Sequence, residues 1–161
     1  MRTQFTILLA LLASGLASAG PVENAEQVGQ WRQAHEQAIV DRFAELLSIP
    51  NVAADTANVR KNADHISGML RTAGMEVELL ELDGANPVVF ARRDTPGAEK
   101  TLMAYVHYDG QPVNADDWAS DPWAPVMRTD TVEHGGRQVA MQAPFDPSWR
   151  IFARWAGDDK A

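Results

Sequence analysis

The chain contains no cysteine among its 161 residues. This absence excludes disulfide bonds, thiolate metal ligands and a cysteine nucleophile, and it also excludes a lipid-modified cysteine after a leader sequence. Any metal that the protein binds must therefore be held by His, Asp or Glu side chains.

Basic residues are few relative to acidic ones, with 14 Lys and Arg against 22 Asp and Glu and a formal net charge of −8. A chain this acidic repels the phosphate backbone on which nucleic-acid binding depends. We therefore expect no nucleic-acid partner.

Long apolar runs are also scarce. The run at residues 5–16 follows Arg2 and leads into the triplet Ala17-Ser18-Ala19. A basic start, a short apolar stretch and an A-x-A site are typical of a secretory signal peptide, here residues 1–19, whereas the triplet disfavours an uncleaved anchor. The run is too short for a comfortable span and no second one follows, so we expect no membrane contact after cleavage. The sequence predicts an exported protein, periplasmic or secreted.

Cleavage would leave 142 residues (161 minus 19), enough for one domain with its own core. Apolar residues at helical spacing predict an amphipathic helix over residues 24–48, which Pro50 would end. A second helix is predicted over residues 56–73, with Gly74 at its C-terminal cap.

After Gly74 the pattern changes to that of strands. Residues 75–82 alternate apolar with acidic side chains, and residues 101–107 are nearly all apolar, which is typical of an interior parallel strand covered on both faces. Further strands are expected at residues 88–92, 126–128, 138–141 and 149–154. The predicted fold class is α/β, an open mixed sheet with flanking helices.

His107 would lie at the C-terminal end of that interior strand, the edge where open α/β sheets place their ligands. Asp109, two residues later, can accept a hydrogen bond from the imidazole and so orient a metal-binding histidine. Taken alone, a His-x-Asp motif is more often a strand-end histidine beside a turn residue, so both interpretations stay open.

A second feature is Asp158-Asp159-Lys160, after the last predicted strand. Two adjacent carboxylates repel each other unless a cation neutralises them. A buried pair would favour a metal site, whereas an exposed pair would simply be solvated.

In order along the chain, the segments HYDGQP from His107, Asp121-Pro122 between two tryptophans, and IFARWAGDDKA at the end resemble one known family. It is the co-catalytic di-zinc metallopeptidase family of carnosinase-like dipeptidases, aminoacylases and glutamate carboxypeptidases. The likeness is closest to the dipeptidase branch. It implies that residues 20–161 form the N-terminal, incomplete part of a metallopeptidase catalytic domain.

The resemblance implies two divalent metal ions, expected to be zinc, although manganese and cobalt suit the same ligands. His107 would bind one ion, Asp158 would bridge both, and Asp109 would join the catalytic apparatus by orienting His107. Asp159 and Lys160 would support these ligands. The substrate would be a peptide or acyl-amino acid, whose amide bond a metal-activated water hydrolyses.

In that family the general-base glutamate lies beyond the Asp-Asp-Lys motif, so the chain as given is expected to lack it and to be inactive alone. The full-length protein is expected to dimerise through a separate lid domain. Two alternatives remain open: a non-catalytic truncated remnant or binding protein that retains half of the metal site, and a small α/β adaptor in which the motifs are coincidental.

Several aromatic and histidine residues fall outside the expected site. Trp155 stands where the family usually has a small residue, so its ring is expected to crowd Asp158. Trp118 and Trp123 are predicted to pack the loop onto the domain rather than to stack on substrate. The remaining histidines are predicted to be helix-face or surface residues: His35, His65 and His134.

Overall fold

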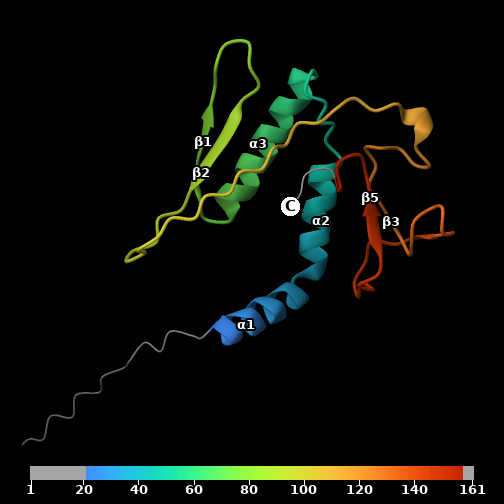
Figure 1. Cartoon of the computed structure of the whole chain (residues 1–161), viewed down its shortest axis with the longest axis horizontal. Helices are drawn as coiled ribbons and strands as arrows, with labels where there is room; N and C mark the ends of the chain where they lie inside the picture. The colour runs from blue at the N-terminus through green and yellow to red at the C-terminus, as the bar shows by residue number, and fades with distance from the viewer. Residues whose placement is uncertain (1–20, 158–161) are drawn as a thin grey trace, which may run out of the picture. The chain divides into compact units, whose positions relative to one another are not determined.

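The computed structural model describes residues 21–157, so the predicted signal peptide and Asp158-Asp159-Lys160 lie outside the described residues. The described chain is α/β, as predicted (Figure 1). It divides into two compact units, the first ending at Ala34 and the second beginning at His35. In chain order the elements are α1 (Pro21–Ala34), α2 (Glu36–Leu47), α3 (Thr56–Thr72), β1 (Glu76–Leu80), β2 (Val88–Arg92), the 3₁₀ turn η1 (Ala115–Asp117), β3 (Val126–Arg128), β4 (Gln138–Val139) and β5 (Arg150–Phe152).

The single helix predicted over residues 24–48 is wrong, because the chain forms two helices, α1 and α2. His35 separates them, with φ −118° and ψ 12°, outside the helical region. Its carbonyl still accepts the Ile39 N–H at 3.0 Å, so α2 starts at once. Helix α1 has a much weaker apolar face than α2, and the prediction joined the two because apolar residues recur on both sides of His35. No helix of the described residues is long and apolar enough to cross a membrane.

Helix α3 has a well-defined cap at each end. The Asp55 carboxylate accepts the Asn58 N–H at 3.1 Å at the N-terminus. At the other end Gly74 has φ +80°, its N–H donates to the Arg71 carbonyl, and the Met75 N–H reaches back to the Leu70 carbonyl. This bond pair is a Schellman motif, which confirms the predicted role of Gly74.

Strands β1 and β2 form an antiparallel hairpin in which Glu76 lies opposite Arg92 and Leu80 opposite Val88. Helix α3 packs against both strands (Figure 1). Side chains alternate along each strand between half-buried and exposed, as expected for a sheet covered on one face. The alternation read from the sequence is confirmed here.

The second sheet is antiparallel, in the order β4-β3-β5. Just after β5, Ala153 and Trp155 pack with Leu47 at the end of α2 in a buried core cluster. The Trp155 indole is 8% exposed, and its Nε1–H donates to the Leu47 carbonyl at 3.2 Å. Trp155 is therefore a core residue that joins α2 to the segment after β5.

The interior strand predicted at residues 101–107 is wrong. Those residues form no strand, and the side chains of Leu102, Met103, Tyr105 and Val106 are 96%, 87%, 88% and 59% exposed. An interior strand needs a neighbour on each edge, but β1 pairs with β2, and β3 with β4 and β5. Among the described residues the one parallel pairing is an isolated bridge between Val52 and Gly110. An apolar run indicates a propensity to form a strand, but it does not indicate whether neighbouring strands are present to pair with it.

Candidate functional site

His107 and Asp109 lie in contact, but Nδ1 of the imidazole is hydrogen-bonded to the main-chain carbonyl of Asp109 rather than to the predicted carboxylate. His107 Nδ1 lies 2.9 Å from the Asp109 main-chain carbonyl and 3.5 Å from its carboxylate Oδ1. A carbonyl oxygen can only accept, so Nδ1 carries the proton and the lone pair of the neutral ring is on Nε2. The two side chains are 40% and 45% exposed, so both are partly accessible to solvent.

The turn that carries this pair is fixed to the chain between α2 and α3. The Gly110 N–H donates to the Asn51 carbonyl at 2.7 Å, and the Ala53 N–H donates to the Gly110 carbonyl at 2.8 Å. The fully buried Asn51 side chain also donates from Nδ2 to the Tyr108 carbonyl at 3.3 Å. These bonds hold the main chain on both sides of Asp109.

Gly110 allows close packing at this position. A Cβ atom added there would lie 3.1 Å from both the Nδ2 and the Oδ1 atoms of Asn51. The glycine thus lets the loop approach Asn51 closely enough for the paired main-chain bonds. Asn51 was missed in the sequence, because nothing in its local pattern distinguishes it from an ordinary residue after Pro50.

Tyr108 anchors the turn from its other side. Its hydroxyl donates to the Pro87 carbonyl, just before β2, and its ring packs against the Leu47 core cluster. Burial, with a smaller contribution from the negative charge of Asp109, raises the pKa of the Tyr108 phenol. The hydroxyl therefore stays protonated and remains a donor at neutral pH.

Within residues 21–157 no group of three or more metal-binding side chains comes together. Asp158, the predicted bridging ligand, lies outside the described residues. The structure thus brings together His107 and Asp109, and their imidazole nitrogen and carboxylate oxygens are donor types that zinc, manganese and cobalt accept.

The other histidines provide a useful contrast. His134 is a surface residue, as predicted, with its side chain 73% exposed and its Nδ1 3.7 Å from Asp130 Oδ1. His65 lies on α3, also as predicted, whereas His35 lies at the junction of α1 and α2. His134 with Asp130 is therefore a second His–Asp pair of similar composition on an exposed turn.

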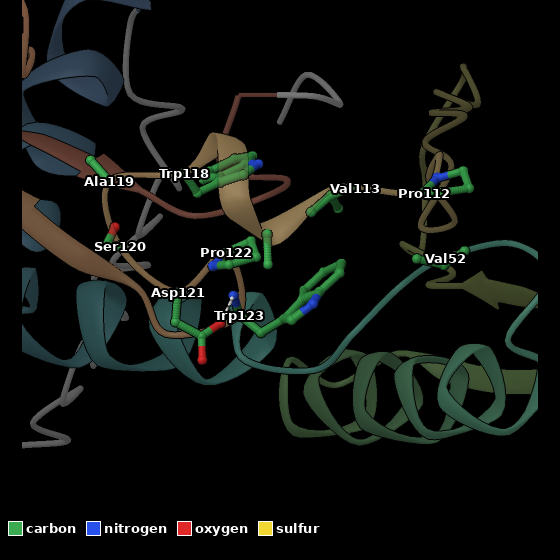
Figure 2. Close-up of a pocket in the computed structure, with 10 residues that line it drawn as sticks. Val52, Pro112, Val113, Trp118, Ala119, Ser120, Asp121, Pro122 and Trp123 are labelled. Carbon is green, nitrogen blue, oxygen red and sulfur yellow. Dashed lines mark hydrogen bonds between the residues drawn. The ribbon is translucent and has the colours of Figure 1, made fainter.

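An open cleft of about 590 Å³ lies in the loop that follows the His107 turn. Figure 2 shows Val52 and Pro112 at one end of it and Ala119 and Ser120 at the other. Trp118 and Trp123 form part of the wall, and Trp123 also packs against the Leu47 core cluster. The predicted packing role of Trp123 is confirmed.

Two curated proteins show sequence similarity to this chain. The Cys-Gly metallodipeptidase dug1 of Schizosaccharomyces pombe is 29% identical over 134 residues, which cover 75% of this chain and 24% of that protein. The Cys-Gly metallodipeptidase DUG1 of Candida albicans is 31% identical over 100 residues, 52% of this chain and 21% of that protein. The chain spans about a quarter of the length of these relatives or less. No family model and no solved structure matches.

These similarities support the resemblance noted in the sequence at the level of metallopeptidases. Both names describe metal-dependent dipeptidases. They do not separate the dipeptidase branch from aminoacylases or glutamate carboxypeptidases.

Proposed function

We propose that this chain carries the first metal-binding part of a metal-dependent hydrolase that cleaves the amide bond of dipeptides or acyl-amino acids. Sequence similarity to two metallodipeptidases supports the class of reaction. The observation that carries the proposal is the 2.9 Å contact between His107 Nδ1 and the Asp109 carbonyl. It is the arrangement found where a histidine binds metal through its other nitrogen.

In this proposal Nε2 of His107 and the carboxylate of Asp158 would help to hold two divalent ions, expected to be zinc. Asp109 would orient the His107 ring. When bound, such ions lower the pKa of a shared water and polarise the amide carbonyl. The contribution of the described residues is positional: Asn51 and Gly110 hold the turn, so the imidazole does not have to be ordered when metal binds.

The general-base glutamate and the remaining ligands are proposed to come from sequence that the relatives have and this chain does not span. The proposed place of action is outside the cytoplasm, on the strength of the signal-like residues 1–19.

A zinc titration of two matched variants tests this function. Isothermal calorimetry with Zn²⁺ should show that His107→Ala weakens binding at least about tenfold, because it removes a nitrogen ligand. His134→Ala is the control, since His134 also lies near an aspartate but on a largely exposed turn. It should leave the isotherm unchanged.

Equal losses from the two variants, or none from His107→Ala, would contradict a specific site at His107. The same samples assayed with Cys-Gly dipeptide separate the remaining alternatives. Zinc binding without hydrolysis fits a half-site, and hydrolysis that depends on His107 would show that the chain is sufficient for catalysis. No zinc effect of any kind would favour the adaptor.

A further inference from the structure

The loop that follows the His107 turn is tied to the segment after β5 by the Arg154 side chain. Its Nη2 donates to the main-chain carbonyl of Gln111 at 3.0 Å, across 43 positions of the sequence. Gln111 lies four residues after His107 and directly before Pro112. Because Pro112 has no N–H, this point of the loop is held through an acceptor. A cationic side chain thus holds the chain one residue beyond Gly110.

The main chain of Arg154 is fixed independently of its side chain. Its N–H donates to the Pro122 carbonyl at 2.7 Å. The residues on either side of it, Ala153 and Trp155, are buried, and the Trp155 indole donates to the Leu47 carbonyl. The guanidinium therefore extends from a segment that is already anchored. A substitution of the Arg154 side chain leaves this main-chain bond and these core contacts in place.

The His107 turn is thereby held from two sides. On one side, residues 51–53 bond to the N–H and the carbonyl of Gly110. On the other side, Arg154 bonds to the carbonyl of Gln111. A hydrogen bond from a charged donor is stronger than one between neutral groups. The two peptide units that follow Asp109 therefore link the connection between α2 and α3 to the segment after β5.

We propose that Arg154 is a positioning residue of the proposed metal site. Its guanidinium offers only donors and cannot itself bind a cation, so it acts through the main chain that it holds. It sets the His107 turn against the segment that leads, four residues later in the sequence, to Asp158. Ligands from separate segments bind a cation more tightly when their positions are set before the cation arrives. This role rests on the proposed function, since it requires His107 to be a ligand.

Arg150 supplies a matched control for substitutions of Arg154. It lies on β5, four residues earlier, and carries the same charge. Its Nη1 donates to the Ser148 carbonyl at 2.8 Å and lies 3.8 Å from Asp130 Oδ1, and neither contact reaches the His107 turn. Arg154→Met and Arg150→Met therefore remove the same charge, but only the first removes a bond to the loop after His107. Arg154→Lys restores one cationic donor.

Amide hydrogen exchange of the metal-free chain, recorded with EDTA, measures whether Arg154 holds the turn. Arg154→Met should speed exchange of the Gly110 N–H by about three- to tenfold, the equivalent of one hydrogen bond. The Val59 N–H, which donates to the Asp55 carbonyl at the start of α3, should exchange at its unmodified rate. Arg150→Met should change neither rate. Equal acceleration at both amides in Arg154→Met, or none at either, overturns the proposal.

Zinc calorimetry on the same variants measures the consequence for metal binding. Arg154→Met should weaken Zn²⁺ binding severalfold, by less than His107→Ala does, and Arg154→Lys should recover part of the loss. Removal of a positive charge by itself favours a bound cation, so charge alone does not explain a weaker affinity. Arg150→Met should therefore not weaken binding, and an equal loss in both Met variants overturns the proposal.

The His107→Ala isotherm separates this role from the proposed function. If His107→Ala weakens zinc binding and Arg154→Met does not, the role of Arg154 is overturned and the proposed function stands. If His107→Ala leaves the isotherm unchanged, the proposed function is overturned, and the role of Arg154 with it.

Discussion

At the scale of single residues, the candidate site depends on the contact between Asn51 and the turn around Asp109, which no local sequence pattern predicts. Asn51 is separated from Gly110 by 59 positions, yet its carbonyl and side chain hold the main chain around Asp109. The Asn51 side chain is buried, so replacing it with a smaller residue leaves a small cavity. The Tyr108 carbonyl then also loses the hydrogen bond from Asn51 Nδ2. The turn that carries the proposed metal ligand His107 is thus held by Asn51, a residue with no proposed part in metal binding or catalysis.

A double-mutant cycle between these two residues tests this positioning. Asn51→Ala should lower the free energy of unfolding by about 1–2 kcal/mol, through the lost hydrogen bond. Gly110→Ala should lower it by about 1 kcal/mol, because the new Cβ would press on the Asn51 side chain. In the double variant that crowding is absent, so the combined loss should fall short of the sum by about 0.5–1 kcal/mol. Urea unfolding measures all three; strict additivity would show that the contact is unimportant.

The N-cap of α3 gives a pH-dependent prediction. Two hydrogen bonds from Asn58 hold the pKa of Asp55 below its ordinary value of 3.8. The larger effect comes from the Asn58 side chain and the smaller one from its main-chain N–H. A depressed folded-state pKa means that the ionised carboxylate stabilises the fold above the unfolded value and that this stabilisation is lost as pH falls through the folded value. Asp55→Asn keeps a capping oxygen but cannot titrate.

Thermal melts between about pH 2 and pH 7 should therefore show a smaller acid-side fall in melting temperature for Asp55→Asn than for the unmodified chain. Above about pH 5 the variant should melt at a slightly lower temperature, because it has lost a charged cap near a helix N-terminus. Identical acid limbs for the two proteins would mean that Asp55 is not linked to folding.

At the scale of elements, the sequence predicts well those features that a short window determines. Helix α3, its glycine terminus and the two hairpin strands follow from periodicity and caps within a few residues. The predictions that fail depend on something outside the window. The break at His35 depends on the local backbone conformation of a single residue, and the strand at residues 101–107 required sheet neighbours that the described residues do not provide.

Two glycines near the end of α3 should respond to alanine in opposite directions. Gly74 has φ +80°, a conformation that costs an L-residue about 1–2 kcal/mol, so Gly74→Ala should destabilise by about that amount. Gly68 lies inside the same helix with open space around it, so Gly68→Ala should stabilise by about 0.5–1 kcal/mol. Chemical denaturation of both variants measures the change in the free energy of unfolding. A change of the same sign in the two variants would contradict the assigned end of α3.

At the scale of the whole molecule, the sequence identified the local part of the candidate site and missed its supports. His107 and Asp109 are two residues apart, so a contact between them could be expected from the motif, but its acceptor is the main-chain carbonyl and not the predicted carboxylate. The bonds from Asn51, and that from the Tyr108 hydroxyl to Pro87, join distant parts of the chain, and no local pattern encodes them. The roles of His107, Asp109 and Asp158 in metal binding stay predictions.

The central claim is that His107 binds metal through Nε2 while Asp109 holds Nδ1. The most direct measurement is a long-range ¹H–¹⁵N correlation spectrum of the histidine rings, recorded without and with Zn²⁺ and assigned with the His107→Ala and His134→Ala variants. If His107 binds zinc through Nε2, zinc should shift the Nε2 resonance of His107, leave its Nδ1 protonated, and leave the His134 ring unchanged. A shift at Nδ1 of His107, or a zinc response confined to the other histidines, would contradict it.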